Sequence, residues 1–374
     1  MITRSDYLVA FFAALVVSLI TTAVVRRFAV KKNIVDVPGT SERKIHAKPT
    51  PLLGGLAVFA AFHIGIFAFF HDELTTGYLL TKHLISLLIG GGLIMFGGYI
   101  DDRYNISARY QIIWPLMAVL IVVAGGIGVD YIRNPFGDFI WLNTYSIHVF
   151  SFNGLPYKIT LFADIFTVMW ILGSAYTTKM LDGLDGLVSG IGAIAAFIFF
   201  FLSLSKDVGQ PETALLSIIL AGALIGFLFW NYHPAKIFLG EGGSLFVGFM
   251  IGTLAILSGA KVATALLLLG IPALDILWVV GRRLLVERKS PFSGDRKHLH
   301  FRMLDIGFSQ TTTVHILYVV TLVFGITGLL LSGRQKFFAL AGLVIFMLIL
   351  AVFIVYQYRK LPKNIAKDGR GSQD

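Results

Sequence analysis

The segment LISLLIGGGLIMFGGYIDDRYN, residues 84–105, joins an uncharged apolar run to a sharply polar end. Residues 84–100 match the ~17 to 25 apolar residues that cross a bilayer as a helix, and residues 8–25 form another such run. Hydrophobic residues make up 56% of the 374-residue chain and charged residues 14%, which excludes an ordinary soluble domain. The sequence therefore predicts an all-α polytopic membrane protein.

Hydropathy in windows of about 19 residues predicts eleven transmembrane helices. The expected spans are residues 6–26, 53–71, 83–100, 111–129, 160–178, 186–205, 213–232, 243–260, 262–283, 313–332 and 337–357. The first span carries its basic cluster after the apolar run, so we expect it to stay as an anchor. Residues 1–360 then form one membrane domain, and we expect residues 361–374 to be a disordered polar tail.

Most of the 31 Lys and Arg fall in loops on one face of these predicted spans. By the positive-inside rule this face is cytoplasmic, with the C-terminus inside and the N-terminus outside. The one long external loop, residues 130–159, has alternating stretches around Asn153-Gly154, which predict a small β-hairpin. The net charge of +10 then reflects topology and anionic lipid, and we expect no nucleic-acid partner.

Polar residues of catalytic type gather in four loops of the predicted cytoplasmic face. These loops are Asp101–Asn105, Lys179–Asp185, Gly240–Ser244 and Asp295–Arg302. Agreement of four loops on one face favours a single shared site.

Two of these loops carry paired carboxylates. Asp101 and Asp102 would point about 100° apart on a helix, so that one can hold a cation while the other acts elsewhere. Asp182 and Asp185 are spaced i,i+3 with glycines beside them. The alternatives are an acidic helix boundary for the first pair and a short acidic turn for the second.

Three further polar residues are expected to lie near these two acidic pairs. Glu241 lies in a glycine-rich turn before a helix, where free backbone N–H groups suit an anion. Asn105 follows the first pair by one turn, and carboxylates with an amide indicate Mg²⁺ or Mn²⁺. Lys179 is either a salt-bridge partner or a phosphate contact, and the sequence leaves both open.

The fourth loop is strongly basic and suits a phosphorylated substrate; the alternative is positive-inside charge without a ligand. His298 and His300 would reach one phosphate together only from an extended segment. Asp275, three residues after Pro272 in a predicted span, is expected to be a buried structural partner of Arg282.

These parts together predict phosphoryl transfer between a lipid phosphate and a soluble nucleotide. An alternative of another class is a transporter or flippase for an anionic lipid or a nucleotide sugar. That function needs ionisable groups near the bilayer midplane and repeated halves. Asp164 and Asp275 are the only mid-span acids, and no internal repeat is evident.

A set of motifs covering residues 43 to about 307 resembles the polyprenyl-phosphate N-acetylhexosamine-1-phosphate transferases. The motifs are, in order, RKIH with PTPLLGG, DDRYN, LDGLDGL, GEGGSLFVGF, GIPALDILWVVGRR and DRKHLHFRMLDIG. This family includes undecaprenyl-phosphate N-acetylglucosaminyl and phospho-N-acetylmuramoyl-pentapeptide transferases. The resemblance implies that a polyprenyl phosphate attacks the β-phosphate of a UDP-amino sugar and releases UMP.

The resemblance further implies an enzyme of the bacterial cytoplasmic membrane, with its active site on the cytoplasmic face, in the first membrane step of cell-envelope polysaccharide synthesis. The DRKHLHF motif looks more like the N-acetylglucosamine enzymes, so we expect UDP-N-acetylglucosamine as donor and undecaprenyl phosphate as acceptor. The alternatives are UDP-MurNAc-pentapeptide or another UDP-N-acetylhexosamine. The sequence leaves a homodimer open.

Site residues follow by position from the resemblance. The expected catalytic residues are Asp101, Asp102, Asp182 and Asp185. The expected substrate-binding residues are Lys179, Arg109, Asp295, Arg296, His298, His300, Arg302, Lys44 and His46. The expected metal ligands are Asp102, Asp182, Glu241 and Asn105. One of Asp101 and Asp102 is expected to act on the lipid phosphate as general base and the other to support the metal; which does which stays open, as does a covalent intermediate.

Four positions depart from the family pattern. Asn105 stands where many members have a third Asp, Lys179 where Asn is usual, Glu241 where the pattern is Gly-Asp-x-Gly-Ser, and Phe301 where a further His is common. These departures bear on the metal-ligand set, not on the reaction class. We expect Glu241 still to contact the metal, because the flanking glycines can absorb its longer reach; the alternative is a helix-capping role.

Overall fold

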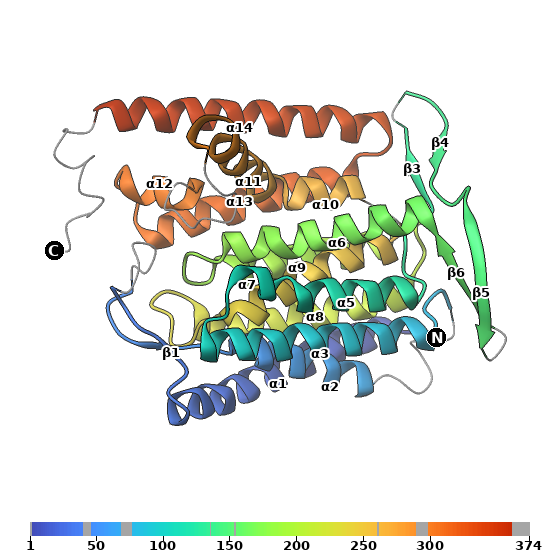
Figure 1. Cartoon of the computed structure of the whole chain (residues 1–374), viewed down its shortest axis with the longest axis horizontal. Helices are drawn as coiled ribbons and strands as arrows, with labels where there is room; N and C mark the ends of the chain where they lie inside the picture. The colour runs from blue at the N-terminus through green and yellow to red at the C-terminus, as the bar shows by residue number, and fades with distance from the viewer. Residues whose placement is uncertain are drawn as a thin grey trace.

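The computed structural model of the chain is a bundle of apolar helices that run between two ends of the molecule (Figure 1). It describes residues 2–39, 46–68, 77–134, 136–152, 155–259, 262–288 and 298–360. The helices are α1 (Arg4–Lys31), α2 (Gly54–Ala68), α3 (Thr81–Tyr104), α4 (Ala108–Gln111), α5 (Ile113–Ala124), α6 (Leu161–Leu181), α7 (Leu187–Ser203), α8 (Pro211–Asn231), α9 (Gly240–Leu257), α10 (Val262–Leu268), α11 (Gly270–Arg282), α12 (Leu299–Asp305), α13 (Gln310–Leu330) and α14 (Arg334–Lys360). A π-helical turn, η1 (Arg283–Glu287), continues α11.

Seven of the described helices are long and apolar enough to cross a membrane: α1, α3, α6, α8, α9, α13 and α14. The pair α10 and α11, bent by 76°, makes an eighth if it counts as one span. The predicted spans 53–71, 111–129 and 186–205 fall on shorter apolar helices. At 1.5 Å per residue a 15-residue helix such as α2 falls short of the ~30 Å hydrocarbon core. A polytopic helical membrane protein is confirmed, and eleven crossings stay a prediction.

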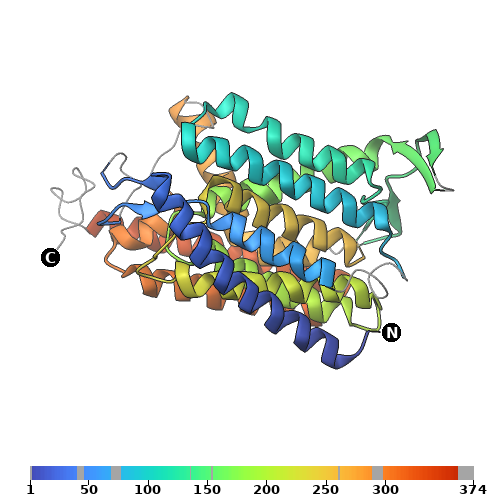
Figure 2. The same cartoon turned by 90° about the horizontal axis from the view of Figure 1, so that it is seen from below.

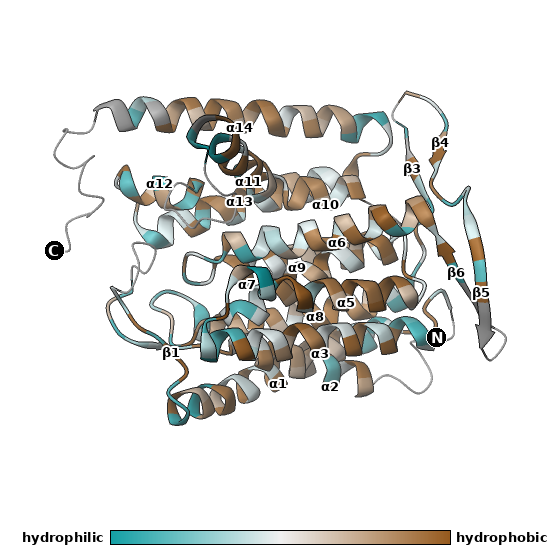
Figure 3. Ribbon diagram, viewed as in Figure 1, coloured by the Kyte–Doolittle hydropathy of each residue, from teal (hydrophilic) through white to brown (hydrophobic). Residues whose placement is uncertain are grey.

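Helix α9 forms the centre of the bundle. Its apolar window is 94% buried, whereas that of α14 is 11% buried and exposes its apolar side chains on the outside of the bundle. Helices α2, α3, α6 and α7 pack around α9, and α1 lies against α8 on an outer side (Figure 2). Hydrophobic residues follow the length of the helices and hydrophilic ones gather near their ends (Figure 3). This distribution fits a protein that places its outer helices in lipid.

The segment between α5 and α6 contains two antiparallel strand pairs at one end of the bundle (Figure 1). Strand β3 (Tyr131–Arg133) pairs with β4 (Phe139–Trp141), and β5 (Ser146–Phe152) with β6 (Leu155–Thr160). The predicted turn Asn153-Gly154 lies outside the described residues. A hairpin is present where the sequence predicts one, and its external location stays a prediction.

A third strand pair lies at the opposite end, where β1 (Val35–Asp36) meets β2 (Thr50–Pro51). Helix α1 begins at the end that carries β3 to β6, and α14 finishes at the end that carries β1. The loops after α3, α6 and α8 also lie at the β1 end. Three of the four polar loops therefore meet at one end of the bundle, together with α12 of the fourth.

We predict that the β1 end faces the cytoplasm. In this cysteine-free chain, Lys236→Cys at the β1 end should react with a membrane-impermeant maleimide only after the cells are permeabilised. Asn143→Cys, exposed between β4 and β5, is the matched variant and should react in intact cells. The parent chain controls for background labelling. The reverse pattern, with Lys236→Cys labelled from outside, would contradict the predicted topology.

Candidate functional site

The end of α3 meets the start of α9 through a carboxylate and a backbone amide. The Glu241 N–H donates to Oδ1 of Asp102 at 3.0 Å. Gly240, with φ of +76°, has its Cα so close to the Asp102 carboxylate that a Cβ there would collide with it. The group that accepts at the N-terminus of α9 is thus the carboxyl group of the chain's own Asp102.

Close backbone contacts fix this arrangement. A methyl group on Gly98 of α3 would collide with Gly242 of α9, and one on Gly55 of α2 would collide with Gly243. Small residues let membrane helices approach until their backbones touch. The position of Glu241 relative to α3 and α2 is therefore set by main-chain contact.

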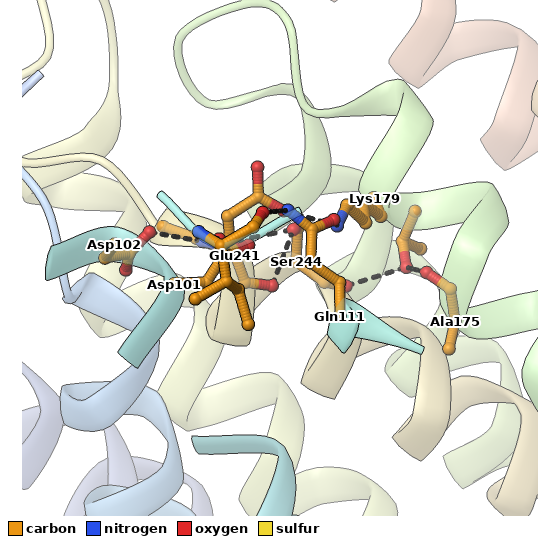
Figure 4. Close-up of polar contacts among 10 residues, drawn as sticks. Asp101, Asp102, Gln111, Ala175, Lys179, Glu241 and Ser244 are labelled. Carbon is orange, nitrogen blue, oxygen red and sulfur yellow. Dashed lines mark hydrogen bonds and ion pairs between the residues drawn. The ribbon is translucent and has the colours of Figure 1, made fainter. Parts of the chain in front are cut away.

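Lys179, near the end of α6, joins two other elements of the site (Figure 4). Its Nζ lies 2.8 Å from Oε2 of Glu241 and 2.8 Å from Oε1 of Gln111, the last residue of α4. Gln111 also donates to the Ile106 carbonyl at 3.0 Å and hydrogen-bonds to Asp101. Of the two functions that the sequence left open for Lys179, the ion pair is present.

A small pocket opens between α3, α5, α6 and α9. Its polar side consists of Asp101, Gln111, Lys179 and Glu241. Its apolar side is lined by Ile94, Trp114, Pro115 and Leu245. Asp101 accepts a hydrogen bond from the Ile106 N–H at 3.0 Å, which fixes its carboxylate toward this pocket. The pocket therefore sets charged groups beside apolar ones, in a space that as arranged is about the size of one water molecule.

The second acidic pair follows α6 and divides into two environments. Asp185 accepts hydrogen bonds from Nδ1 of His233 at 2.7 Å and from the Ala235 N–H at 3.0 Å. Asp182 has a side chain that reaches solvent, yet the protein packed around it, together with the charges of Glu241 and Asp185, raises the pKa of Asp182 above the usual aspartate value. Asp185 is thus held by the loop between α8 and α9, whereas Asp182 is subject to the charges of the other carboxylates.

Asn231, at the end of α8, connects the loop of Asp182 and Asp185 to the loop before α9. Its Oδ1 accepts from the Gly186 N–H at 3.1 Å and from the Ser189 hydroxyl at 2.8 Å. Its Nδ2 donates to the Ile237 carbonyl at 3.0 Å. One buried amide therefore holds two parts of the site in register.

The histidine motif is held by Asp275 of α11. The carboxylate binds Nδ1 of His298 at 2.8 Å and accepts from the Leu299 N–H at 2.9 Å. The chain is extended at His298 and helical from Leu299, and the rings of His298 and His300 stack parallel with centroids 5.8 Å apart. The two rings share one side although only His298 is extended and His300 is already in α12, so the fully extended segment expected from the sequence is not present.

His300 connects this motif to the second acidic loop. Its ring lies so close to Gly183 that a Cβ at Gly183 would crowd Nε2. Loss of water on burial lowers the pKa of His300 to about 3, with a further lowering from His298 and an opposing effect of Asp275. The imidazole is neutral at pH 7, and its buried Nε2 has no hydrogen-bond partner among the residues that the structure describes. It can accept a donor or bind a substrate, but it carries no charge.

The other predicted substrate-binding residues lie around this centre. Arg109 of α4 lies over the ring of Tyr110, and Arg302 is on α12 beyond the two histidines. His46 contacts the Asp36 carbonyl through Nε2 at 3.3 Å and packs against Phe238. Lys44, Asp295 and Arg296 lie outside the described residues.

The expected metal ligands do not form a coordination sphere. Within the described ranges, no group of three or more His, Asp or Glu side chains is placed to hold one metal ion. Asp102 accepts a backbone N–H, Glu241 is paired with Lys179, and Asn105 is exposed at the left-handed end of α3. As arranged, these residues do not fit Mg²⁺ or Mn²⁺ bound by this set.

Sequence reasoning missed several residues that position the site. Asp275 was expected to pair with Arg282, but its carboxylate holds His298 and the start of α12. No local pattern identifies Gln111 or Asn231, because each is a single amide in an apolar chain. Asp275 alone had a signal, since it stands in one of the motifs that carry the family resemblance.

Comparison with known proteins gives a consistent result. Residues 84–259 match the model of glycosyl transferase family 4. The chain is 32% identical to a probable undecaprenyl-phosphate N-acetylglucosaminyl 1-phosphate transferase of Bacillus subtilis, over 92% of this chain and 90% of the relative. It is 31% identical to the decaprenyl-phosphate N-acetylglucosaminephosphotransferase of Mycolicibacterium smegmatis, over 82% and 77%. It is 30% identical to a putative UDP-N-acetylglucosamine–dolichyl-phosphate N-acetylglucosaminephosphotransferase of Sulfolobus acidocaldarius, over 71% and 74%.

We predict that Gly98→Ala destabilises the protein by about 1–3 kcal/mol, because the added methyl group forces α3 away from α9. Gly92→Ala on the same helix is the matched control. Its Cβ would meet only the far end of Phe59 at 3.9 Å, and Ala favours helix by up to about 1 kcal/mol over Gly. Thermal unfolding in detergent should show a lower melting temperature for Gly98→Ala alone. Equal melting temperatures would show that the α3–α9 contact is not tight.

Proposed function

Because this chain belongs to glycosyl transferase family 4, we propose that it transfers N-acetylglucosamine 1-phosphate from UDP-N-acetylglucosamine to undecaprenyl phosphate and releases UMP. Its match to the family model and its likeness to polyprenyl-phosphate N-acetylglucosamine-1-phosphate transferases establish the membership. The observation that carries this proposal is the pocket between α3, α5, α6 and α9, which is polar on one side and apolar on the other.

The proposed reaction exchanges one phosphorus–oxygen bond for another. A phosphate oxygen of the lipid bonds to the β-phosphorus of the donor, and the bond from that phosphorus to the bridging oxygen breaks. The bridging oxygen leaves with the electron pair as part of UMP, and the sugar 1-phosphate remains on the lipid as a diphosphate. Little covalent work falls to the protein, so positioning and charge neutralisation dominate.

We assign the lipid acceptor to the pocket beside Asp101, which has to widen to admit it. Ile94, Trp114 and Leu245 suit the first isoprene units, which continue into the surrounding bilayer, while Lys179 and Gln111 suit the phosphate. The second pKa of a phosphate monoester is about 6, so part of the acceptor carries a proton at neutral pH. We assign Asp101 as the base that accepts this proton, because its carboxylate lines the pocket.

Asp102 has a different role in this proposal. Its carboxylate binds the N-terminus of α9 and thereby fixes the backbone of Glu241. It is a positioning residue, whereas Asp101 contacts the acceptor. Asp182, whose raised pKa favours a bound proton, lies between the acceptor pocket and the histidine motif.

The nucleotide donor suits the side of the site formed by α12. His298 is oriented by Asp275 through Nδ1, and when both ring nitrogens carry a proton its Nε2–H can donate to a phosphate oxygen. His300 stacks on it beside the loop of Asp182, and Arg302 adds a fixed positive charge on the same short helix. A diphosphate is favoured by such multiple donors.

A transporter is less consistent with this structure. It requires ionisable groups near the middle of the membrane. Of the two mid-span acids, Asp164 accepts from the Thr160 N–H at the start of α6, and Asp275 binds the histidine motif. Both acids therefore have a local structural partner. We place the enzyme in the bacterial cytoplasmic membrane with this site facing the cytoplasm, at the first membrane step of cell-envelope polysaccharide synthesis.

The direct test uses purified protein, undecaprenyl phosphate and a panel of UDP-sugars, with and without added Mg²⁺. We expect UMP release with UDP-N-acetylglucosamine and formation of one lipid-linked product per UMP. UDP-MurNAc-pentapeptide and UDP-N-acetylgalactosamine are the matched competitors. Release of UMP only with another UDP-sugar would change the proposed donor, and release with none of them would contradict the proposed reaction.

We predict that Asp101→Asn lowers kcat more than tenfold at pH 7, which corresponds to more than about 1.4 kcal/mol of barrier. The loss should grow below pH 6, where more of the acceptor phosphate is protonated and a base is needed. Asp102→Asn keeps an oxygen that accepts the Glu241 N–H, so it should keep kcat within tenfold of the parent. A kcat of Asp101→Asn within tenfold of the parent at both pH values would remove the base assignment.

We also predict that the double variant His298→Ala, His300→Ala binds UDP-N-acetylglucosamine at least tenfold more weakly than the parent. Its affinity for undecaprenyl phosphate should change by less than threefold, because the lipid pocket lies on the other side of the acidic loop. His148→Ala, exposed on strand β5, is the control for loss of a histidine. Unchanged nucleotide affinity, measured by calorimetry, would contradict the donor assignment.

A further inference from the structure

Two of the four departures from the family pattern contact each other. The motif resemblance implies Asn at position 179 and Asp at position 241, where this chain has Lys179 and Glu241, and the structure pairs these two side chains at 2.8 Å. The two residues are 62 positions apart on different helices, α6 and α9. At this point of the site the chain thus pairs a long cation with a long anion.

The Lys179 ammonium lies in a group of carboxylates. Glu241 contacts it directly, Asp101 lines the same pocket, and Glu241 in turn acts electrostatically on Asp101, Asp102 and Asp182. The Lys179 side chain is 17% exposed and that of Glu241 is 42% exposed, so solvent screens the ammonium less than it screens the carboxylate. Among the described residues, the Lys179 ammonium is therefore a positive charge surrounded by the carboxyl groups of Asp101, Asp102, Asp182 and Glu241.

A divalent cation and an ammonium compete for the same oxygen. A metal ion ligated by Glu241 needs Oε2 or its partner oxygen at about 2.0–2.1 Å, and Mg²⁺ demands near-octahedral geometry around it. An ammonium 2.8 Å from that carboxylate occupies the adjacent space and repels a second cation. This agrees with the lack, among the described residues, of a three-ligand group able to hold a metal.

We propose that the Lys179 ammonium takes the place of a divalent cation at Glu241, and that it supplies the fixed positive charge that contacts a substrate phosphate in the pocket. The contact with phosphate rests on the proposed function; the exclusion of a metal from Glu241 does not. Of the carboxylates that the structure describes, Glu241 is the one in direct contact with the Lys179 ammonium. Oε1 of Gln111 accepts a hydrogen bond from Nζ at 2.8 Å and helps to keep the ammonium in the pocket. The third N–H of the ammonium is then available for a phosphate oxygen.

The first experiment measures Mn²⁺ binding to the purified protein by electron paramagnetic resonance. Nucleotide is left out, because a diphosphate binds Mn²⁺ itself. We expect Glu241→Gln to bind Mn²⁺ within threefold of the parent, since Glu241 is not a ligand. A tenfold or larger loss of Mn²⁺ affinity in Glu241→Gln would overturn the proposal. This comparison needs no active enzyme.

The second experiment restores the family residues. The double variant Lys179→Asn, Glu241→Asp should gain a Mn²⁺ site at least tenfold tighter than that of the parent, because the ammonium is gone and a carboxylate is free. Lys179→Arg is the control that keeps the charge, and it should gain no site. A double variant with parental Mn²⁺ affinity and a parental melting temperature would show that Lys179 does not exclude a metal.

Activity separates this proposal from the proposed function. We expect UMP release by the parent to fall less than tenfold when EDTA replaces Mg²⁺, and that of the double variant to fall more than a hundredfold. A parent that loses more than a hundredfold in EDTA, as the double variant does, would overturn the exchange of lysine for metal. Absence of UMP release under every condition would contradict the proposed function, while the Mn²⁺ titrations would still decide the role of Lys179.

Discussion

The close contact of α9 with α2 and α3 is the constraint on which the site depends. Gly242 meets Gly98, and Gly243 meets Gly55, so the first turn of α9 can approach two helices at main-chain distance. Lipid offers no hydrophobic drive for helix association, and such packing must come from contact area and hydrogen bonds. The same contact brings Asp102 to the amide of Glu241, so helix packing and site geometry are a single feature.

The sequence predicts the helical class and the meeting of the polar loops, because both depend on long patterns. Apolar runs identify α1, α3 and α8, and the charge distribution assigns the motif loops to one face. Crossing number is less well determined, since α2 and α7 are apolar but short and their embedding depends on neighbours. Local pattern cannot predict that α10 and α11 bend by 76° between them.

Within the site, residue types are predictable and partners are not. The glycine-rich start of α9 indicates an acceptor at a helix N-terminus, and the acceptor in the structure is the carboxyl group of Asp102, 139 residues earlier in the chain. The i,i+7 spacing of Asp275 and Arg282 suggests an ion pair on one helix face. In the structure, Asp275 instead binds His298, which lies beyond the end of α11. Long-range partners depend on how helices pack, which spacing along one helix does not report.

The hydrogen bonds of the site divide it into two rigid halves with a short connection. On one side Asp101, Lys179 and Glu241 surround the amphipathic pocket, and on the other Asp275 fixes the stacked histidines. The loop after α6 lies between them, in contact with His300 through Gly183 and tied to α8 by Asn231. Phosphoryl transfer needs an acceptor oxygen in line with a phosphorus atom, and holding two reactants in that geometry supplies much of the rate. Because both halves hold their polar groups through backbone amides and buried carboxylates, the bundle can fix that alignment before either substrate arrives.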